Sequence, residues 1–255
     1  MQVNEQDIQN IVRSVLSEMT SSKPQASSSG SIPKTAKVSM LTGERKMEIM
    51  EFPIPEVGDD DILVKVEGCG ICGTDVHEWK GDPFGYIPVI LGHEGTGEVI
   101  ALGKNVKIDS AGNPIKVGDK LVTSVISCGH CNSCMLHPDQ PHLCENQGIY
   151  GLIPNKNKAL NGWFASHMLI GKGSTFFVVS ELNLNQRMLL ELAAVCVHAI
   201  GRAQSTGLLH FNSKVLLQGC GPVGLMMTAV LKASGINYII ALDGDSKRLE
   251  MAKRL

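Results

Sequence analysis

Residues 128–144 read CGHCNSCMLHPDQPHLC and contain four of the eight cysteines in the chain. Three of these cysteines follow at C-x2-C-x2-C spacing, and the fourth comes after nine further residues. Two-residue gaps let neighbouring sulfurs reach one tetrahedral ion, and the longer gap brings the fourth thiolate to the last corner. Four thiolates leave no position open for a substrate, so this stretch, the cysteine lobe, predicts a structural zinc site. Its ligands would be Cys128, Cys131, Cys134 and Cys144.

Two alternatives exist for the cysteine lobe. It could be a redox-active or merely buried cysteine cluster, although buried cysteines do not usually fall at ligand spacing. A histidine of the same stretch could also replace one sulfur, and the three available are His130, His137 and His142. Because four sulfurs already complete the shell, we expect these histidines to be surface residues.

The composition is that of a globular chain without the features of a nucleic-acid or membrane protein. The chain has 255 residues, 43% of them hydrophobic, and a formal charge of -2, and is long enough for two domains with separate cores. Aromatic residues make up only 4%, and no run of Lys and Arg forms the basic stripe that phosphate binding needs. Since no apolar stretch approaches roughly 20 residues and the start lacks a secretory layout, we predict a cytoplasmic protein. There, thiolates bind metal more often than they form disulfides.

Four segments follow one another along the chain. Residues 1–20 carry an apolar stripe at helical spacing and predict a short amphipathic helix, while residues 21–35 are rich in Ser and Pro and predict a flexible linker. Residues 36–190 contain short β runs broken by Gly and Pro, which indicates a barrel-like β domain with its chemistry on loops. Residues 191–255 begin with a helix and continue as strand, helix and strand, a βαβ unit that stops one helix later.

The βαβ unit carries a nucleotide-binding motif. Residues 215–227 read VLLQGCGPVGLMM, which places GxGxxG between an apolar strand and a helix. Asp243 closes the next strand, where a carboxylate can accept hydrogen bonds from ribose hydroxyls and would repel the extra phosphate of NADP. NAD is therefore the predicted cofactor. Arg248 would touch the ribose or be a solvated helix charge. The residues assigned to NAD are Gly219, Gly221, Pro222, Val223, Gly224, Asp243 and Arg248.

Two further motifs precede the cysteine lobe. Residues 68–79 read GCGICGTDVHEW and residues 88–99 read PVILGHEGTGEV. Together with the lobe and the βαβ unit, they closely resemble the zinc-dependent medium-chain alcohol dehydrogenases, the family that includes sorbitol and threonine dehydrogenases. The resemblance covers residues 37–255. It implies an α/β plus β fold, with a GroES-like β-barrel catalytic domain over 36–190 followed by an incomplete Rossmann βαβ domain over 191–255.

The resemblance also implies a catalytic zinc, the second zinc ion of the chain. Cys72 and His93 match the first two ligands of this zinc. Glu191 matches the third ligand, seven residues before His198, and Glu94 is the alternative. Three protein ligands leave one corner for water or an alcohol oxygen, whose pKa the cation lowers.

Three other positions match the proton relay of the family. Thr74 and His77 match its hydroxyl and its imidazole, and Asp75 matches a partner that orients a ligand. An imidazole with a pKa near 6.5 is suited to exchange protons with solvent. The implied activity is an NAD-linked conversion of an alcohol or polyol into its aldehyde or ketone, carried out by a homo-oligomer.

The chain ends inside the first of the two halves of a dinucleotide-binding fold. We therefore expect a C-terminally truncated form, either part of a longer protein or a remnant that needs another chain. The alternative function is a non-catalytic zinc-binding scaffold that keeps the architecture without turnover.

Residues 4–19 resemble the encapsulation peptides that direct enzymes into bacterial microcompartments. A free helix of this length is marginal in water, so it would order on a partner surface such as a shell protein. The alternative is an N-terminal helix that packs on its own domain or on a neighbouring subunit.

Overall fold

The computed structural model describes residues 32–255, which fall into two compact units that divide between Glu191 and Leu192. The predicted amphipathic helix and nearly all of the predicted linker lie outside the described residues. None of the helices within 32–255 is long and apolar enough to cross a membrane.

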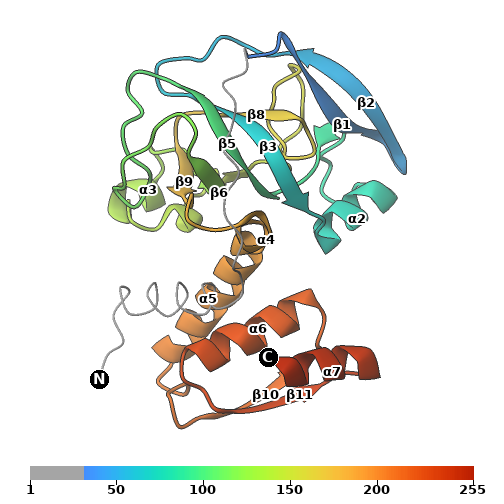
Figure 1. The fold of residues 1–255 in the computed structure, drawn as a ribbon, viewed down its shortest axis with the longest axis vertical. Helices are drawn as coiled ribbons and strands as arrows, with labels where there is room; N and C mark the ends of the chain where they lie inside the picture. Colours follow the sequence, from blue (N-terminus) through green and yellow to red (C-terminus); the bar gives the residue numbers. More distant parts are fainter. Residues whose placement is uncertain (1–31) are drawn as a thin grey trace. The chain divides into compact units, whose positions relative to one another are not determined.

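The first unit is built mainly from antiparallel strands (Figure 1). The smaller sheet has the order β2-β1-β4, formed by β1 (Thr35–Gly43), β2 (Lys46–Pro53) and β4 (Val89–Ile90). The larger sheet has the order β7-β6-β5-β3-β8, and β9 pairs with β6. Its strands are β3 (Ile62–Gly70), β5 (Glu94–Leu102), β6 (Lys120–Ile126), β7 (Gly148–Ile149), β8 (His167–Ile170) and β9 (Ser174–Val178). The predicted β character of this part is confirmed.

The core of the larger sheet forms because alternate strand residues point to one face. Ile62 and Val64 of β3 meet Met168 and Ile170 of β8 in one buried cluster. Trp163 completes this cluster with 1% of its surface exposed, and its Nε1 donates to Thr123 Oγ1 at 3.2 Å.

Short helices connect the strands of the first unit. Helix α2 (Gly73–Gly81) begins directly after Cys72, where a capping box forms: the Asp75 carboxylate accepts the Cys72 backbone N–H at 2.8 Å. Helix α3 (Asn132–Leu136) and the 3-10 turn η1 (Pro141–Leu143) lie within the cysteine lobe. Helix α4 (Leu184–Met188) follows β9 and leads into α5 (Leu190–Ser205), whose first two residues end this unit.

The second unit contains the predicted βαβ arrangement. Strands β10 (Lys214–Gln218) and β11 (Tyr238–Leu242) pair in parallel, and α6 (Pro222–Ala233) connects them. Helix α7 (Ser246–Arg254) follows. Ile200 of α5, Leu231 of α6 and Ile236 form a small buried cluster. This confirms the strand, helix and strand order predicted for the end of the chain.

Candidate metal centres and nucleotide-binding turn

The cysteine lobe gathers all four of its sulfurs at one point. Ligand atoms of Cys128, Cys131, Cys134 and Cys144 lie within 4.8 Å of one another. Backbone N–H groups point at the sulfurs: the Cys128 N–H donates to Cys144 Sγ at 3.2 Å, and the Cys134 N–H to Cys131 Sγ at 3.5 Å. None of the three lobe histidines belongs to this group.

The thiols of the lobe differ strongly in acidity. The His130 backbone N–H is the main cause that lowers the pKa of Cys128 to about 6. Burial raises the pKa of Cys134 to about 12, with the neighbouring Cys131 thiol acting in the same direction. Acidic groups packed at one point cannot all ionise without a counter-ion, so the donor set and its geometry fit a single soft cation such as zinc.

A second group joins the two motifs that precede the lobe. Ligand atoms of Cys72, His93 and Glu94 lie within 4.8 Å of one another, and we call these three residues the trio. Cys72 is the N-cap of α2, while Glu94 begins β5. The Glu94 carboxylate occupies the space that a side chain at Gly70 would take, so β3 and the start of β5 pack closely there.

Asp75 connects both sides of the trio. Its side chain is 3% exposed; one oxygen accepts the Cys72 N–H, and the other accepts the Gly92 N–H at 3.1 Å. That second oxygen lies 3.6 Å from His93 Nδ1, which is buried and makes no hydrogen bond within residues 32–255. Asp75 therefore lies between the Cys72 backbone and a His93 nitrogen that has no hydrogen-bond partner among the described residues.

The electric field at the trio favours a positive charge. Burial opposes protonation of His93, but Asp75 and Cys72 outweigh it and raise the pKa of His93 to about 9. Glu191 lies outside the trio, although close enough for its pKa to respond: burial raises it, His93 opposes the rise, and Glu94 adds to it. A cation held by a thiolate, an imidazole and a carboxylate fits this arrangement.

The two predicted relay residues are not connected to each other. Thr74 Oγ1 lies 3.7 Å from Cys72 Sγ, while His77 is exposed further along α2. No hydrogen bond joins Thr74 to His77 in the part of the chain that the structure describes.

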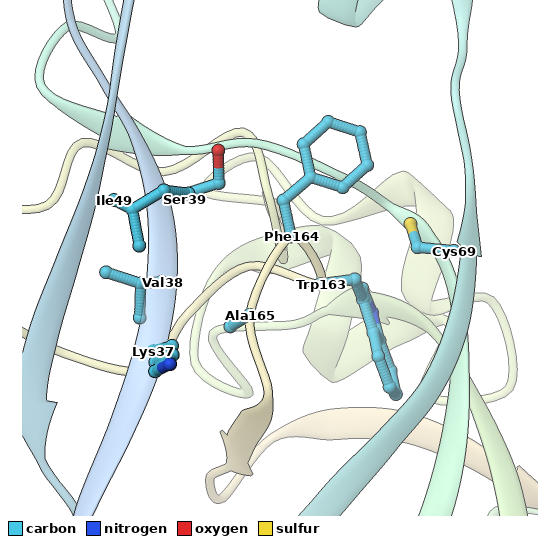
Figure 2. Close-up of a pocket in the computed structure, with 8 residues that line it drawn as sticks. All are labelled: Lys37, Val38, Ser39, Ile49, Cys69, Trp163, Phe164 and Ala165. Atoms are coloured by element: carbon cyan, nitrogen blue, oxygen red, sulfur yellow. The ribbon is translucent and has the colours of Figure 1, made fainter.

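Cys69 lies near the trio without belonging to it. Burial raises the pKa of its thiol to about 12, and the carboxylates of Asp75, Glu94 and Glu191 act in the same direction, while the Glu94 backbone N–H opposes them. Cys69 also lines an open pocket of about 420 Å³, where Figure 2 shows it across from Val38 and Ser39. The other lining residues are Lys37, Ile49, Trp163, Phe164 and Ala165. No local pattern links Cys69 to residues so distant in the sequence.

The GxGxxG turn of the second unit is tight because two of its glycines pack closely together. Gly219 has a φ of 96°, and a side chain on Gly224 would overlap the Gly219 carbonyl oxygen. Gly221 caps α6, which begins at Pro222, followed by the half-exposed Val223. These positions leave backbone N–H groups at the helix N-terminus available to a phosphate.

Asp243 faces this turn from the end of β11. Its carboxylate accepts the Cys220 N–H at 2.7 Å and the Asp245 N–H at 2.8 Å, and these donors lower the pKa of Asp243. Arg248 Nη1 lies 3.7 Å from the Asp243 carboxylate with a largely exposed side chain. The structure thus brings the predicted acidic residue, the arginine and the GxGxxG turn together.

Comparisons with known proteins show similarity to dehydrogenases. Residues 58–180 match the alcohol dehydrogenase GroES-like domain. Sorbitol dehydrogenase of Bacillus subtilis (strain 168) is 31% identical over 233 residues, 88% of this chain and 60% of the relative. L-threonine 3-dehydrogenase of Photorhabdus laumondii is 32% identical over 225 residues, 86% of this chain and 60% of that protein.

Among solved structures, an alcohol dehydrogenase from Thermotoga maritima superposes with a TM-score of 0.76 at 29% identity. The match covers 86% of this chain and 60% of that one. The chain thus spans about 60% of the length of the relatives it matches.

Proposed function

We propose that this chain, which is similar to zinc-type medium-chain alcohol dehydrogenases, carries the metal-binding part and the adenosine-binding part of an NAD-linked oxidoreductase. The reaction would interconvert a small alcohol or polyol with its aldehyde or ketone by hydride transfer. The observation that carries the proposal is the trio, in which a thiol, an imidazole and a carboxylate from two separate motifs converge within 4.8 Å.

In this proposal Cys72, His93 and one carboxylate hold a catalytic zinc. Glu94 belongs to the trio, and Glu191 is the alternative third ligand. When bound, the metal supplies a Lewis acid with one open corner that makes an alcohol hydroxyl more acidic. The four sulfurs of the cysteine lobe hold a second, structural zinc.

The remaining residues position ligands and move a proton. Asp75 fixes Cys72 and the backbone beside His93 through two N–H groups. Thr74 lies next to the Cys72 sulfur and would relay the proton of the substrate hydroxyl, releasing its own hydroxyl proton as it accepts that one. His77, exposed on the same helix, would exchange that proton with solvent.

NAD is the proposed oxidant. Asp243 carries a negative charge at the end of β11, directly against the Gly-rich turn, where it would accept ribose hydroxyls and repel the extra phosphate of NADP. Arg248 lies close enough to contact the same ribose.

Metal content tests the enzyme proposal against a non-catalytic scaffold. We expect two zinc ions per chain, falling to one in Cys72→Ser. Cys69→Ser is the matched control, because Cys69 lies close to the same carboxylates but outside the trio. One zinc in the unmodified protein, unchanged by Cys72→Ser, would favour a scaffold held only by the lobe. Rates of NAD reduction with sorbitol, threonine and butanediol would then show which class of alcohol is the substrate.

We further propose that residues 4–19 bind a microcompartment shell protein and that the enzyme forms homo-oligomers. The support for the first proposal is the apolar stripe of this segment, followed by a Ser- and Pro-rich stretch. Removal of residues 1–30 from a fluorescent fusion should disperse its puncta in a microcompartment-forming host. Unchanged clustering would argue against encapsulation. The proposed homo-oligomer is tested separately, by measuring the molar mass of the purified protein with light scattering.

A further inference from the structure

Arg187 is a buried cation whose partner lies far away in the sequence. It belongs to α4, its side chain is 6% exposed, and Nη2 lies 2.7 Å from the Glu67 carboxylate of β3. Burial lowers the pKa of Arg187 while Glu67 opposes the change. Desolvation offsets much of the attraction in a buried ion pair, so this pair contributes little net stability by itself.

Glu67 lies on the strand that leads into the trio. At the next residue of β3, a Cβ atom on Gly68 would lie 2.6 Å from the Met188 sulfur and 3.3 Å from Leu184 Cδ1, so α4 packs directly on this strand. Gly70, on the same face, is covered by the Glu94 carboxylate. One face of β3 therefore packs against both α4 and Glu94 of the trio.

The chain passes from Arg187 to Glu191 in four residues. The backbone N–H of Leu189 caps α4 by donating to the carbonyls of Gln186 and Arg187, and α5 starts at Leu190. With α4 fixed to β3, this short connection determines where Glu191 enters the first turn of α5. The Glu191 carboxylate is then half-buried, within electrostatic reach of His93 and Glu94.

Glu67 also has a second cation. Lys120 of β6 donates to Glu67 at 2.8 Å and to Glu98 at 2.6 Å. Removing the Arg187 charge therefore leaves Glu67 neutralised by Lys120, and removing Lys120 leaves α4 attached to Glu67. Comparing variants of the two cations therefore distinguishes a positioning role of Arg187 from simple neutralisation of the Glu67 charge.

From these contacts we propose that the Arg187–Glu67 ion pair is a positioning device that sets the approach of Glu191 to the catalytic-type metal. The inference rests on the proposed zinc site at the trio. Arg187 acts through Glu191 and does not touch the metal or the substrate.

The test is cobalt(II) binding to the 255-residue chain, followed by d–d absorption and by competition with a chromophoric chelator. Arg187→Met should weaken cobalt binding at the trio about tenfold and shift the d–d bands of the bound cobalt. Loss of a residue that supports a metal ligand typically lowers metal affinity by about 10- to 100-fold, and we expect the smaller effect here. Glu191→Gln should give the same shift, and the double variant should add nothing further. Arg187→Lys should restore part of the affinity, while Lys120→Met should leave the trio spectrum unchanged.

The possible outcomes distinguish failure of the positioning role of Arg187 from failure of the proposed metal site at the trio. If Arg187→Met weakens cobalt binding as much in the Glu191→Gln background as in the wild type, the ion pair acts by general stability and the positioning role is wrong. An unchanged trio spectrum in Arg187→Met also refutes it. If the wild-type chain binds one cobalt only, with no effect of Cys72→Ser, the trio site itself fails and both proposals fall.

Discussion

Glu78 of α2 provides a pH-dependent test of the structure. Its side chain is 0% exposed, and neither carboxylate oxygen has a hydrogen-bond partner within residues 32–255. Burial raises the pKa of Glu78 from 4.5 to about 7, and the nearby Asp82 carboxylate adds to the rise. We predict that Glu78→Gln stabilises the protein above pH 7, because the amide keeps the size of the acid and cannot ionise.

The sign and size follow from proton linkage. Between pH 4.5 and 7 the folded protein keeps the Glu78 proton that the unfolded chain has lost, so stability falls as pH rises through this window. The loss is complete above the folded pKa. At 1.36 kcal/mol per unit, the rise in pKa corresponds to about 3 kcal/mol as an upper value.

Thermal unfolding of wild type and Glu78→Gln from pH 5 to 9 measures this effect in saturating zinc. The pH dependence of all other groups is common to both proteins and cancels in the difference. The variant should match the wild type near pH 5 and melt above it at pH 8, by up to roughly 6–12 °C for the upper value of about 3 kcal/mol. Glu51→Gln, exposed on β2, is the matched control and should give a flat difference. A difference for Glu78→Gln that does not change with pH, or a less stable variant at pH 8, would refute the reasoning.

Three further predictions concern single positions. Gly95→Ala should destabilise the first unit by about 1–3 kcal/mol in chemical denaturation, because its Cβ would overlap the Trp163 ring, whereas Gly81→Ala meets open space and should not. Cys131→Ser should lower zinc content by one ion and open the lobe to proteases, while His137→Ala retains both ions; zinc loss in His137→Ala would contradict the four-sulfur site. Gly224→Ala should speed amide exchange in β10 because its Cβ would overlap the Gly219 carbonyl, and Gly221→Ala, with no atom within 4 Å, should leave exchange unchanged.

Features with local signals could be predicted from the sequence. The βαβ unit was predictable because Gly219 and Pro222 mark its turn and apolar runs mark its strands, so β10, α6 and β11 follow in the predicted order. Ligand spacing identified the cysteine lobe for the same reason, since the chemistry of one tetrahedral ion is encoded within seventeen residues.

Long-range pairs could not be predicted. The Arg187 and Glu67 side chains are 120 residues apart in the sequence, and no local sequence pattern around either residue predicts their contact. Glu78 would be assigned to a solvated face of α2, because a lone acid in a short helix is usually exposed. The roles of Thr74 and His77 in proton transfer, implied by the family resemblance, stay a prediction, because no hydrogen bond joins the two side chains within residues 32–255.

The two candidate ligand carboxylates depend on different kinds of contact. Cys72, His93 and Glu94 come together through a helix cap and two strand ends, because Asp75 binds the N–H groups of Cys72 and Gly92 while Glu94 follows His93 directly. Glu191 depends on α4 being attached to β3 by Arg187 and Met188. A local cap forms with the helix itself, whereas a contact across 120 residues requires the whole unit to fold. A metal held first by the trio, and approached by Glu191 only in the completed fold, would account for both carboxylates near one site.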